Sequence, residues 1–168
     1  ELYKKYPKVK LIFLLKEPVG RAFSHYKHNL MMTREWLTFE EAIAIESKRV
    51  NLEYLDLKTS RKDALKNYSN YAYKGKSQYA EQLKPFLDQF PSNQILVLQS
   101  ERFFSKTDDV YNDVCDFLGL KKAGLLNAEP KNQSPISLKI EEQTKQELKD
   151  YFEPYNKELF NLINKKFE

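Results

Sequence analysis

The chain has 168 residues and a formal charge of +4, from 28 basic and 24 acidic side chains that are mixed along the sequence. A chain of this size buries about 70% of its unfolded surface, which suits one domain with its own core. The charges form no block that could act as a nucleic-acid-binding arm, Cys115 has no disulfide partner, and no apolar run approaches the roughly 20 residues of a membrane span.

The first element in chain order is a buried strand that runs into a helix. Residues 11–15 are all apolar, which is typical of a central parallel strand covered on both faces. Pro18 suits the first position of a helix, because its missing N–H would have no partner there in any case. Lys16 therefore lies at the carboxyl end of a strand, where open α/β sheets bind ligands and a helix N-terminus favours anions. This junction predicts an anion-binding site.

Two helices are predicted next. Apolar side chains recur at helical spacing after Pro18, which predicts that the first helix extends to about Arg34. Thr38 and Glu41 then form a capping box, in which each side chain bonds the backbone N–H of the other residue. This box starts a second helix that ends near Arg49.

The segment from Asn51 to Lys76 has no sustained hydrophobic period and is predicted to be a loop with short helical pieces. A loop of this length is often functional, so it could close over an acceptor molecule, or it could be a plain surface connection. Gly75, Lys76 and Ser77 imitate the end of a nucleotide-phosphate loop. No buried strand precedes them, which argues against that motif.

The second half of the chain returns to alternating helix and strand, with a helix over 79–87 and a buried strand over 95–98. Ser105 is predicted to cap a further helix, which ends at Gly119. A final helix is predicted from apolar side chains that recur on one of its faces, namely Leu148, Phe152, Tyr155, Leu159 and Ile163. Pro154 lies within this helix and should kink it or split it.

The strand-to-helix junction resembles the 3′-phosphate-binding segment of the sulfotransferases that use 3′-phosphoadenosine 5′-phosphosulfate (PAPS). In that family a strand leads into Arg-x-Pro and a Ser on the following helix, and the Arg and the Ser hold the 3′-phosphate. Lys16, Pro18 and Ser24 occupy those places, with Lys where Arg is usual. Arginine binds phosphate through two parallel hydrogen bonds and lysine acts as a mobile point charge, so we expect the contact to survive with poorer geometry.

The resemblance continues along most of the chain, in the order of a bacterial or glycan-type sulfotransferase domain. The segments that carry it are 79–87, 90–91, 94–98, Glu101, 117–120 and, in the closing helix, 151–159. It implies a three-layer α/β fold with a parallel sheet flanked by helices, similar to P-loop NTPases, and residues 1–168 as the C-terminal part of one such domain. The implied reaction transfers a sulfuryl group from PAPS to a hydroxyl or amine of a glycan or small-molecule acceptor, without a metal.

Each candidate for binding PAPS has a second interpretation. From spacing alone, Lys16 could be a surface lysine at a strand end, and Ser24 could bond its own helix backbone. Arg21 lies on the same helix and could reach the phosphate, or it could form a local ion pair with Glu17. The resemblance favours Lys16 and Ser24 as phosphate ligands.

Other motifs carry weaker predictions. His25 and His28 lie on one helix, but two histidines without carboxylate partners are a poor metal-ligand set, so no metal is expected. Residues 131–134 precede the last helix, where sulfotransferases commonly bring a loop over the 3′-phosphate; a polar turn is the alternative. Ser77 and Tyr79 open a helix near which related domains meet cofactor or acceptor. The interleaved aromatic residues and lysines fall mostly at core spacing, which argues against nucleic-acid binding.

Two parts of a sulfotransferase site are not found in this sequence. The family holds the 5′-phosphosulfate with a loop that contains a Lys and a Gly-Thr pair, and the chain has no Gly-Thr dipeptide. No catalytic base is identified either, so we name no catalytic residue and expect this segment alone to be inactive. The alternatives are a non-catalytic domain that binds adenosine 3′,5′-bisphosphate (PAP) or a protein, and a different P-loop-like fold such as a kinase relative.

The sequence favours a cytoplasmic location, because it has a single cysteine and no signal or membrane segment. It begins on Glu1 without a Met, so a targeting segment could lie upstream.

Overall fold

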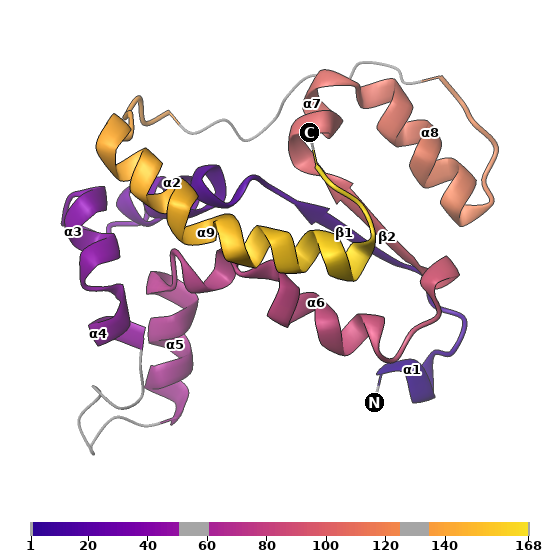
Figure 1. Cartoon of the computed structure of the whole chain (residues 1–168), viewed down its shortest axis with the longest axis horizontal. Helices are drawn as coiled ribbons and strands as arrows, with labels where there is room; N and C mark the ends of the chain where they lie inside the picture. Colours follow the sequence, from indigo (N-terminus) through magenta and orange to yellow (C-terminus); the bar gives the residue numbers. More distant parts are fainter. Residues whose placement is uncertain (1, 51–60, 125–134, 168) are drawn as a thin grey trace. The chain divides into compact units, whose positions relative to one another are not determined.

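The computed structural model describes residues 2–50, 61–124 and 135–167 (Figure 1). The chain divides into two compact units. The sheet unit comprises residues 1–17, 79–133 and 155–168, and the helical unit comprises residues 18–78 and 134–154. No helix in the described ranges is long and apolar enough to cross a membrane.

Two parallel strands form the sheet of the sheet unit. Strand β1 (Leu11–Leu15) pairs with β2 (Ile95–Gln99), and Leu15 lies opposite Gln99, so both strands end at the same edge. Both strands that the sequence predicts, at residues 11–15 and 95–98, are therefore confirmed. The helices of this unit are α1 (Leu2–Lys5), α6 (Tyr79–Leu87), the 3₁₀ turn η3 (Ser92–Gln94), α7 (Ser100–Ser105), α8 (Thr107–Leu118) and the C-terminal part of α9 (Glu142–Ile163).

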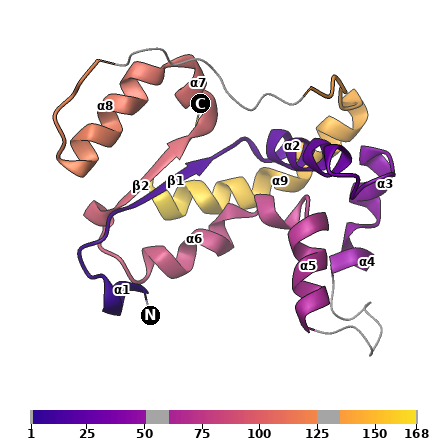
Figure 2. The ribbon, with the colours of Figure 1, turned by 180° about the vertical axis from the view of Figure 1, so that it is seen from behind.

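Helices cover the sheet from two sides (Figures 1 and 2). On one face, Leu15 of β1 joins a buried cluster with Leu83 of α6 and Leu159 of α9. On the other face, α7 and α8 contact β2, where Leu98 is buried. This arrangement is a parallel sheet flanked by helices, as the sequence predicts.

The cover over β1 is incomplete. Ile12 is 40% exposed and Leu14 is 51% exposed, whereas Leu98, the partner of Leu14 on β2, is only 4% exposed. Successive residues of a strand point to opposite faces, so Ile12 and Leu14, two residues apart, share a face. This is the face of Leu98, the partner of Leu14, on which α8 packs against β2. The prediction that β1 is covered on both faces is therefore wrong for the described residues, because the helical layer reaches β2 and leaves these two side chains outside it.

Aromatic and small apolar side chains form the core of the helical unit. Phe39 packs against Tyr26 with ring centroids 5.3 Å apart, and Tyr26 contacts Tyr73 at 6.2 Å. The predicted capping box is confirmed: the Glu41 N–H donates to the Thr38 hydroxyl oxygen at 3.2 Å, and the Thr38 N–H donates to the Glu41 carboxylate at 2.9 Å. The elements of this unit are α2 (Pro18–Met31), α3 (Phe39–Ala44), α4 (Glu46–Val50), α5 (Arg61–Tyr71), the 3₁₀ turn η2 (Gly75–Ser77) and the N-terminal part of α9.

Three predictions for this unit need correction. Helix α2 ends at Met31 rather than near Arg34, because Thr33 takes a left-handed conformation with φ of 51° that ends a helix. The helix predicted to run to Arg49 is divided into α3 and α4 at Ile45. Part of the predicted loop is the 11-residue helix α5, whose low hydrophobicity hides its period.

Two further predictions are wrong at helix ends. Ser105 is the last residue of α7, and α8 follows Lys106, which supplies no side-chain cap. Of the kink or split predicted at Pro154, the split is wrong, because α9 is one continuous helix through Pro154 to Ile163. The predicted end at Gly119 is confirmed: this residue has φ of 75°, a conformation that glycine adopts without steric strain.

Candidate anion-binding site

The first part of the candidate site is the edge of the sheet unit where both strands end. Lys16 follows directly after Leu15 and is exposed. Leu15 lies opposite Gln99, so Lys16 extends from the carboxyl edge of the sheet. Ligands of open α/β folds bind at this edge, and a lysine there suits an anion.

Side chains from two helices fix the backbone that carries Lys16. The Tyr79 hydroxyl at the start of α6 donates to the Lys16 carbonyl at 2.8 Å. The Glu17 N–H donates to the Glu101 carboxylate in the first turn of α7 at 3.0 Å. The second carboxylate oxygen of Glu101 is buried and has no hydrogen-bond partner among the described residues. Tyr79 and Glu101 thus position the strand-to-helix junction.

The other two predicted phosphate ligands, Ser24 and Arg21, lie on α2 in the helical unit. Ser24 is half-buried in the second turn of the helix. The Arg21 guanidinium lies 3.4 Å from the carbonyl oxygens of Ala72 and of Tyr73, and 3.3 Å from Nδ1 of His25. Arg21 therefore holds the backbone of residues 72–73 against the beginning of α2.

Positive charge collects around Arg21 in the helical unit. Burial and the nearby charges of Arg21 and Lys76 lower the pKa of His25 to about 4, so this imidazole is neutral at pH 7. Burial and Arg21 also lower the pKa of Lys76, whose ammonium donates to the Ser69 carbonyl at 2.6 Å. An anion near the first turns of α2 would relieve this repulsion and interact with the positive end of the helix dipole.

Two buried polar side chains hold residues 73–77 beside the start of α2. The Ser77 hydroxyl lies 3.2 Å from the carbonyl oxygens of both Pro18 and Tyr73. The Glu46 carboxylate accepts the N–H groups of Lys74 at 2.8 Å and of Gly75 at 2.9 Å. Burial raises the pKa of Glu46 even though these N–H groups favour the ionised form.

A second carboxylate, Glu35, is completely buried in the same unit. It pairs with Arg49 and accepts the Tyr73 hydroxyl at 2.8 Å, together with the N–H groups of Trp36 at 3.1 Å and Leu37 at 3.2 Å. Burial opposes ionisation, but the bonds from Arg49, Tyr73 and the backbone prevail and lower the pKa of Glu35. This network anchors the side chain of Tyr73, whose backbone carbonyl is one of the two that Arg21 contacts.

Sequence reasoning missed these supporting groups. Glu101 was visible only as part of the resemblance, and nothing in the local sequence distinguishes Glu35 or Glu46 from surface glutamates. His25 packs against Tyr73 with ring centroids 5.0 Å apart, and His28 is exposed. In the part of the chain that the structure describes, no three His, Cys, Asp or Glu side chains could together hold a metal ion. The candidate loop 131–134 lies outside the described residues.

The fold agrees with the comparisons with known proteins. The sulfotransferase domain family matches residues 3–160, so the chain belongs to this family. A solved sulfotransferase from Alicyclobacillus acidocaldarius has a TM-score of 0.79 and 30% identity, with 99% of this chain and 59% of that chain covered. This likeness confirms the predicted α/β sulfotransferase fold.

Curated relatives point to the same family. The membrane-associated sulfotransferase kil1 of Dictyostelium discoideum is 32% identical over 96 residues, which cover 55% of this chain and 20% of that protein. The mouse heparan sulfate glucosamine 3-O-sulfotransferase 3B1 is 23% identical over 181 residues, covering 94% of this chain and 43% of the relative. The chain therefore spans less than half the length of these curated relatives.

Proposed function

We propose that residues 1–168 are the C-terminal part of one PAPS-dependent sulfotransferase domain with a P-loop-like fold. Lys16, Ser24 and Arg21 each contribute a donor to the 3′-phosphate of the nucleotide. The acceptor is a hydroxyl- or amine-bearing molecule. A glycan acceptor is supported by the relatives that act on heparan sulfate glucosamine.

The transfer is a displacement at sulfur. The acceptor oxygen or nitrogen attacks the sulfur atom of PAPS, and the bond from sulfur to the bridging oxygen breaks with its electron pair staying on PAP. The acceptor proton passes to a base, and donors stabilise the charge that develops on the bridging oxygen and the sulfonate. The residues of this chain bind and orient the nucleotide, and we assign none of them as the base.

One observation carries this proposal. Within a chain that matches the sulfotransferase family over residues 3–160, Lys16 stands at the carboxyl edge of the sheet, on a backbone fixed by Tyr79 and Glu101. A surface lysine without a ligand would not require such positioning. Fixing the backbone reduces the conformational freedom that would otherwise be lost when an anion binds.

Isothermal titration with PAP tests the site. Replacing Lys16 by Ala should weaken PAP binding by about 1–3 kcal/mol, the scale of a hydrogen bond to a charged group. Lys8→Ala is the matched control, because Lys8 is an exposed lysine before the other end of β1. Adenosine 5′-phosphate should bind much more weakly than PAP. Equal affinity for the two nucleotides would contradict the 3′-phosphate assignment.

Transfer of radiolabelled sulfate from PAPS to glycan acceptors separates the enzyme from the non-catalytic alternative. The full protein should label an acceptor, and Lys16→Ala should raise the PAPS concentration needed for half-maximal rate. Tight PAP binding without any transfer would instead support a binding domain derived from this fold.

A further inference from the structure

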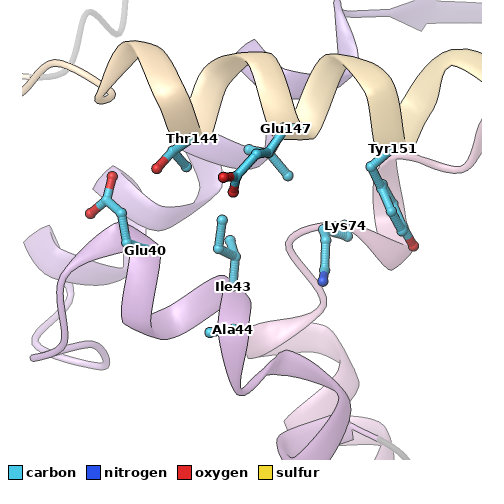
Figure 3. A pocket seen from close by; sticks show the side chains of 8 residues that line it. Glu40, Ile43, Ala44, Lys74, Thr144, Glu147 and Tyr151 are labelled. Carbon is cyan, nitrogen blue, oxygen red and sulfur yellow. The ribbon is translucent and has the colours of Figure 1, made fainter.

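The helical unit and the sheet unit each contain a cavity, and the two differ in charge. In the helical unit, helix α3, the N-terminal part of α9 and Lys74 line a space of 270 Å³ (Figure 3). The carboxylates of Glu40 and Glu147 and the ammonium of Lys74 all line it, so this cavity does not select a ligand of one sign. In the sheet unit, the charged side chains of the described residues that line a cavity of 240 Å³ are all cations.

The cationic cavity lies where β2 ends, at the carboxyl edge of the sheet. The segment after α9 turns back toward α7 and closes the cavity from the other side (Figure 1). None of the residues assigned to the nucleotide lines it. The carboxyl edge is the usual ligand-binding edge of open α/β sheets. The lining is formed by Gln99, Arg102, Lys106, Lys165, Lys166 and Phe167.

Three of the four cations have no carboxylate nearby to balance them. The Arg102 guanidinium donates to the Asp113 carboxylate of α8 at 2.8 Å, which fixes it at the wall of the cavity. Lys106, Lys165 and Lys166 form no ion pair with any residue that the structure describes. Like charges around one cavity repel each other, and an anion between them would relieve that repulsion.

The two lysines after α9 are held between two fixed points of the backbone. Asn164 takes a left-handed conformation with φ of 49° that ends the helix, and the Lys165 N–H donates to the Phe160 carbonyl at 3.2 Å. Phe167 then packs against the core of the sheet unit, where its ring centroid lies 5.7 Å from that of Phe160. Because the backbone is anchored on both sides of Lys165 and Lys166, less conformational freedom is lost when a ligand binds.

The charge and the volume of the cavity indicate a ligand with two linked phosphate groups. One phosphate monoester carries about 1.5 to 2 negative charges at pH 7, fewer than the three positive charges of Lys106, Lys165 and Lys166. A second phosphate provides the missing charge. The volume of 240 Å³ is below the range of about 300–1,000 Å³ for whole small-molecule sites, so the cavity fits a compact anionic group.

We propose that this cavity binds the diphosphate group of free pyrophosphate or of a nucleoside diphosphate. The ammonium groups of Lys106, Lys165 and Lys166 donate to the phosphate oxygens, and Arg102 has further N–H donors beyond the one that Asp113 accepts. The site does not depend on whether Lys16 binds the 3′-phosphate of PAP.

Isothermal titration of the full protein with pyrophosphate tests this site. Lys106→Ala and Lys165→Ala should each weaken pyrophosphate binding severalfold, and the double variant should weaken it by more than about tenfold. Inorganic phosphate should bind about tenfold more weakly than pyrophosphate, the scale of one charged hydrogen bond. Lys84→Ala is the matched control, because Lys84 is an exposed lysine on α6 of the same unit and does not line the cavity.

Titration with ADP distinguishes the two sources of the diphosphate group. Tighter binding of ADP than of pyrophosphate indicates a nucleoside diphosphate, whose base would contact the half-buried Phe167 ring. Tighter binding of pyrophosphate indicates the free anion. With either ligand, Lys165→Ala should weaken binding and Lys16→Ala should change it little.

Four results would overturn the proposal. They are no binding of pyrophosphate, equal binding of phosphate and pyrophosphate, an effect of Lys84→Ala as large as that of Lys165→Ala, and a loss of PAP affinity in Lys165→Ala as large as its loss of pyrophosphate affinity. The last result would make the cavity part of the nucleotide site. Circular dichroism and the melting temperature show whether each variant is folded. Pyrophosphate binding without PAP binding contradicts the proposed nucleotide site and supports this cavity.

Discussion

The sheet unit and the helical unit use charged side chains in opposite ways. In the sheet unit Lys16 is exposed, and the hydrogen bonds of Tyr79 and Glu101 act on its backbone. In the helical unit Glu35 and Glu46 are buried, and their carboxylates hold neighbouring residues in place. The difference indicates that the sheet unit presents charge to a ligand, while the buried charges of the helical unit maintain its own structure.

The largest effect is expected from removing the buried carboxylate of Glu35. Glu35→Ala should lower the free energy of unfolding by about 3–5 kcal/mol, because Arg49 is left as a partly buried charge without its partner. Asp116→Ala breaks the exposed pair with Lys122 in the sheet unit and should cost less than about 1 kcal/mol. Urea denaturation measures the free energy of unfolding of both variants. Equal losses of stability would contradict the conclusion that buried charges maintain the structure of the helical unit while exposed charges of the sheet unit do not.

The next effect concerns the pH dependence of stability. The folded-state pKa of His25 is about 4, below the ordinary value of 6.5, so between these values the unfolded chain binds a proton that the folded chain does not. Stability should therefore fall as the pH drops from 6.5 to 4. His25→Gln should flatten this dependence, and His28→Gln, at an exposed position, should not. Melting temperatures across this pH range provide the measurement, and identical curves for the two variants would contradict the assignment to His25.

A smaller effect should separate positioning from charge at Glu101. Glu101→Ala removes the acceptor of the Glu17 N–H and should weaken PAP binding by about 1 kcal/mol. Glu101→Gln keeps an acceptor oxygen and removes a negative charge near Lys16, so its PAP affinity should equal or exceed that of the parent protein. If both variants lose the same affinity, the charge of Glu101 matters rather than its hydrogen bond to the backbone.

The smallest effect is expected from a conservative change at Lys16. Lys16→Arg restores the residue that is usual in the family and offers two parallel hydrogen bonds to phosphate. PAP affinity should rise by less than about 1 kcal/mol, because the parent lysine already supplies the charge. Calorimetry at two salt concentrations measures the gain, and a weaker complex at both would indicate that this edge is shaped for lysine.

The sequence predicted the elements whose signals are local. The apolar run of β1, the capping box at Thr38 and the glycine at position 119 each act through neighbouring residues, and all three were found at the predicted places. The exposure of Ile12 could not be predicted, because a run of apolar residues does not show whether one face of the strand or both faces are covered by other elements. Helix α5 was missed because its surface is polar almost all round.

The candidate site could be predicted only in part, for the same reason. The position of Lys16 at the strand end was predicted from the strand-to-helix pattern. The conformation of the backbone there depends on hydrogen bonds from residues that are far away in the sequence. Tyr79 and Glu101 were singled out by the resemblance, but they come from distant parts of the chain. Their hydrogen bonds to the backbone at Lys16 and Glu17 depend on how α6 and α7 pack beside the strand end, which no local pattern shows. The cavity beside Lys165 likewise combines the end of β2 with the segment after α9, two parts of the chain that no local pattern connects.

The lone cysteine offers a direct way to follow one unit by itself. Cys115 is 3% exposed on α8 of the sheet unit, and the sequence contains no second thiol. A thiol reagent can modify it only when α8 opens, so the labelling rate under native conditions reports the local opening free energy of this helix. Because no other cysteine has to be removed, the rate at which Cys115 is labelled in the unaltered chain reports how often α8, the helix that covers β2, opens.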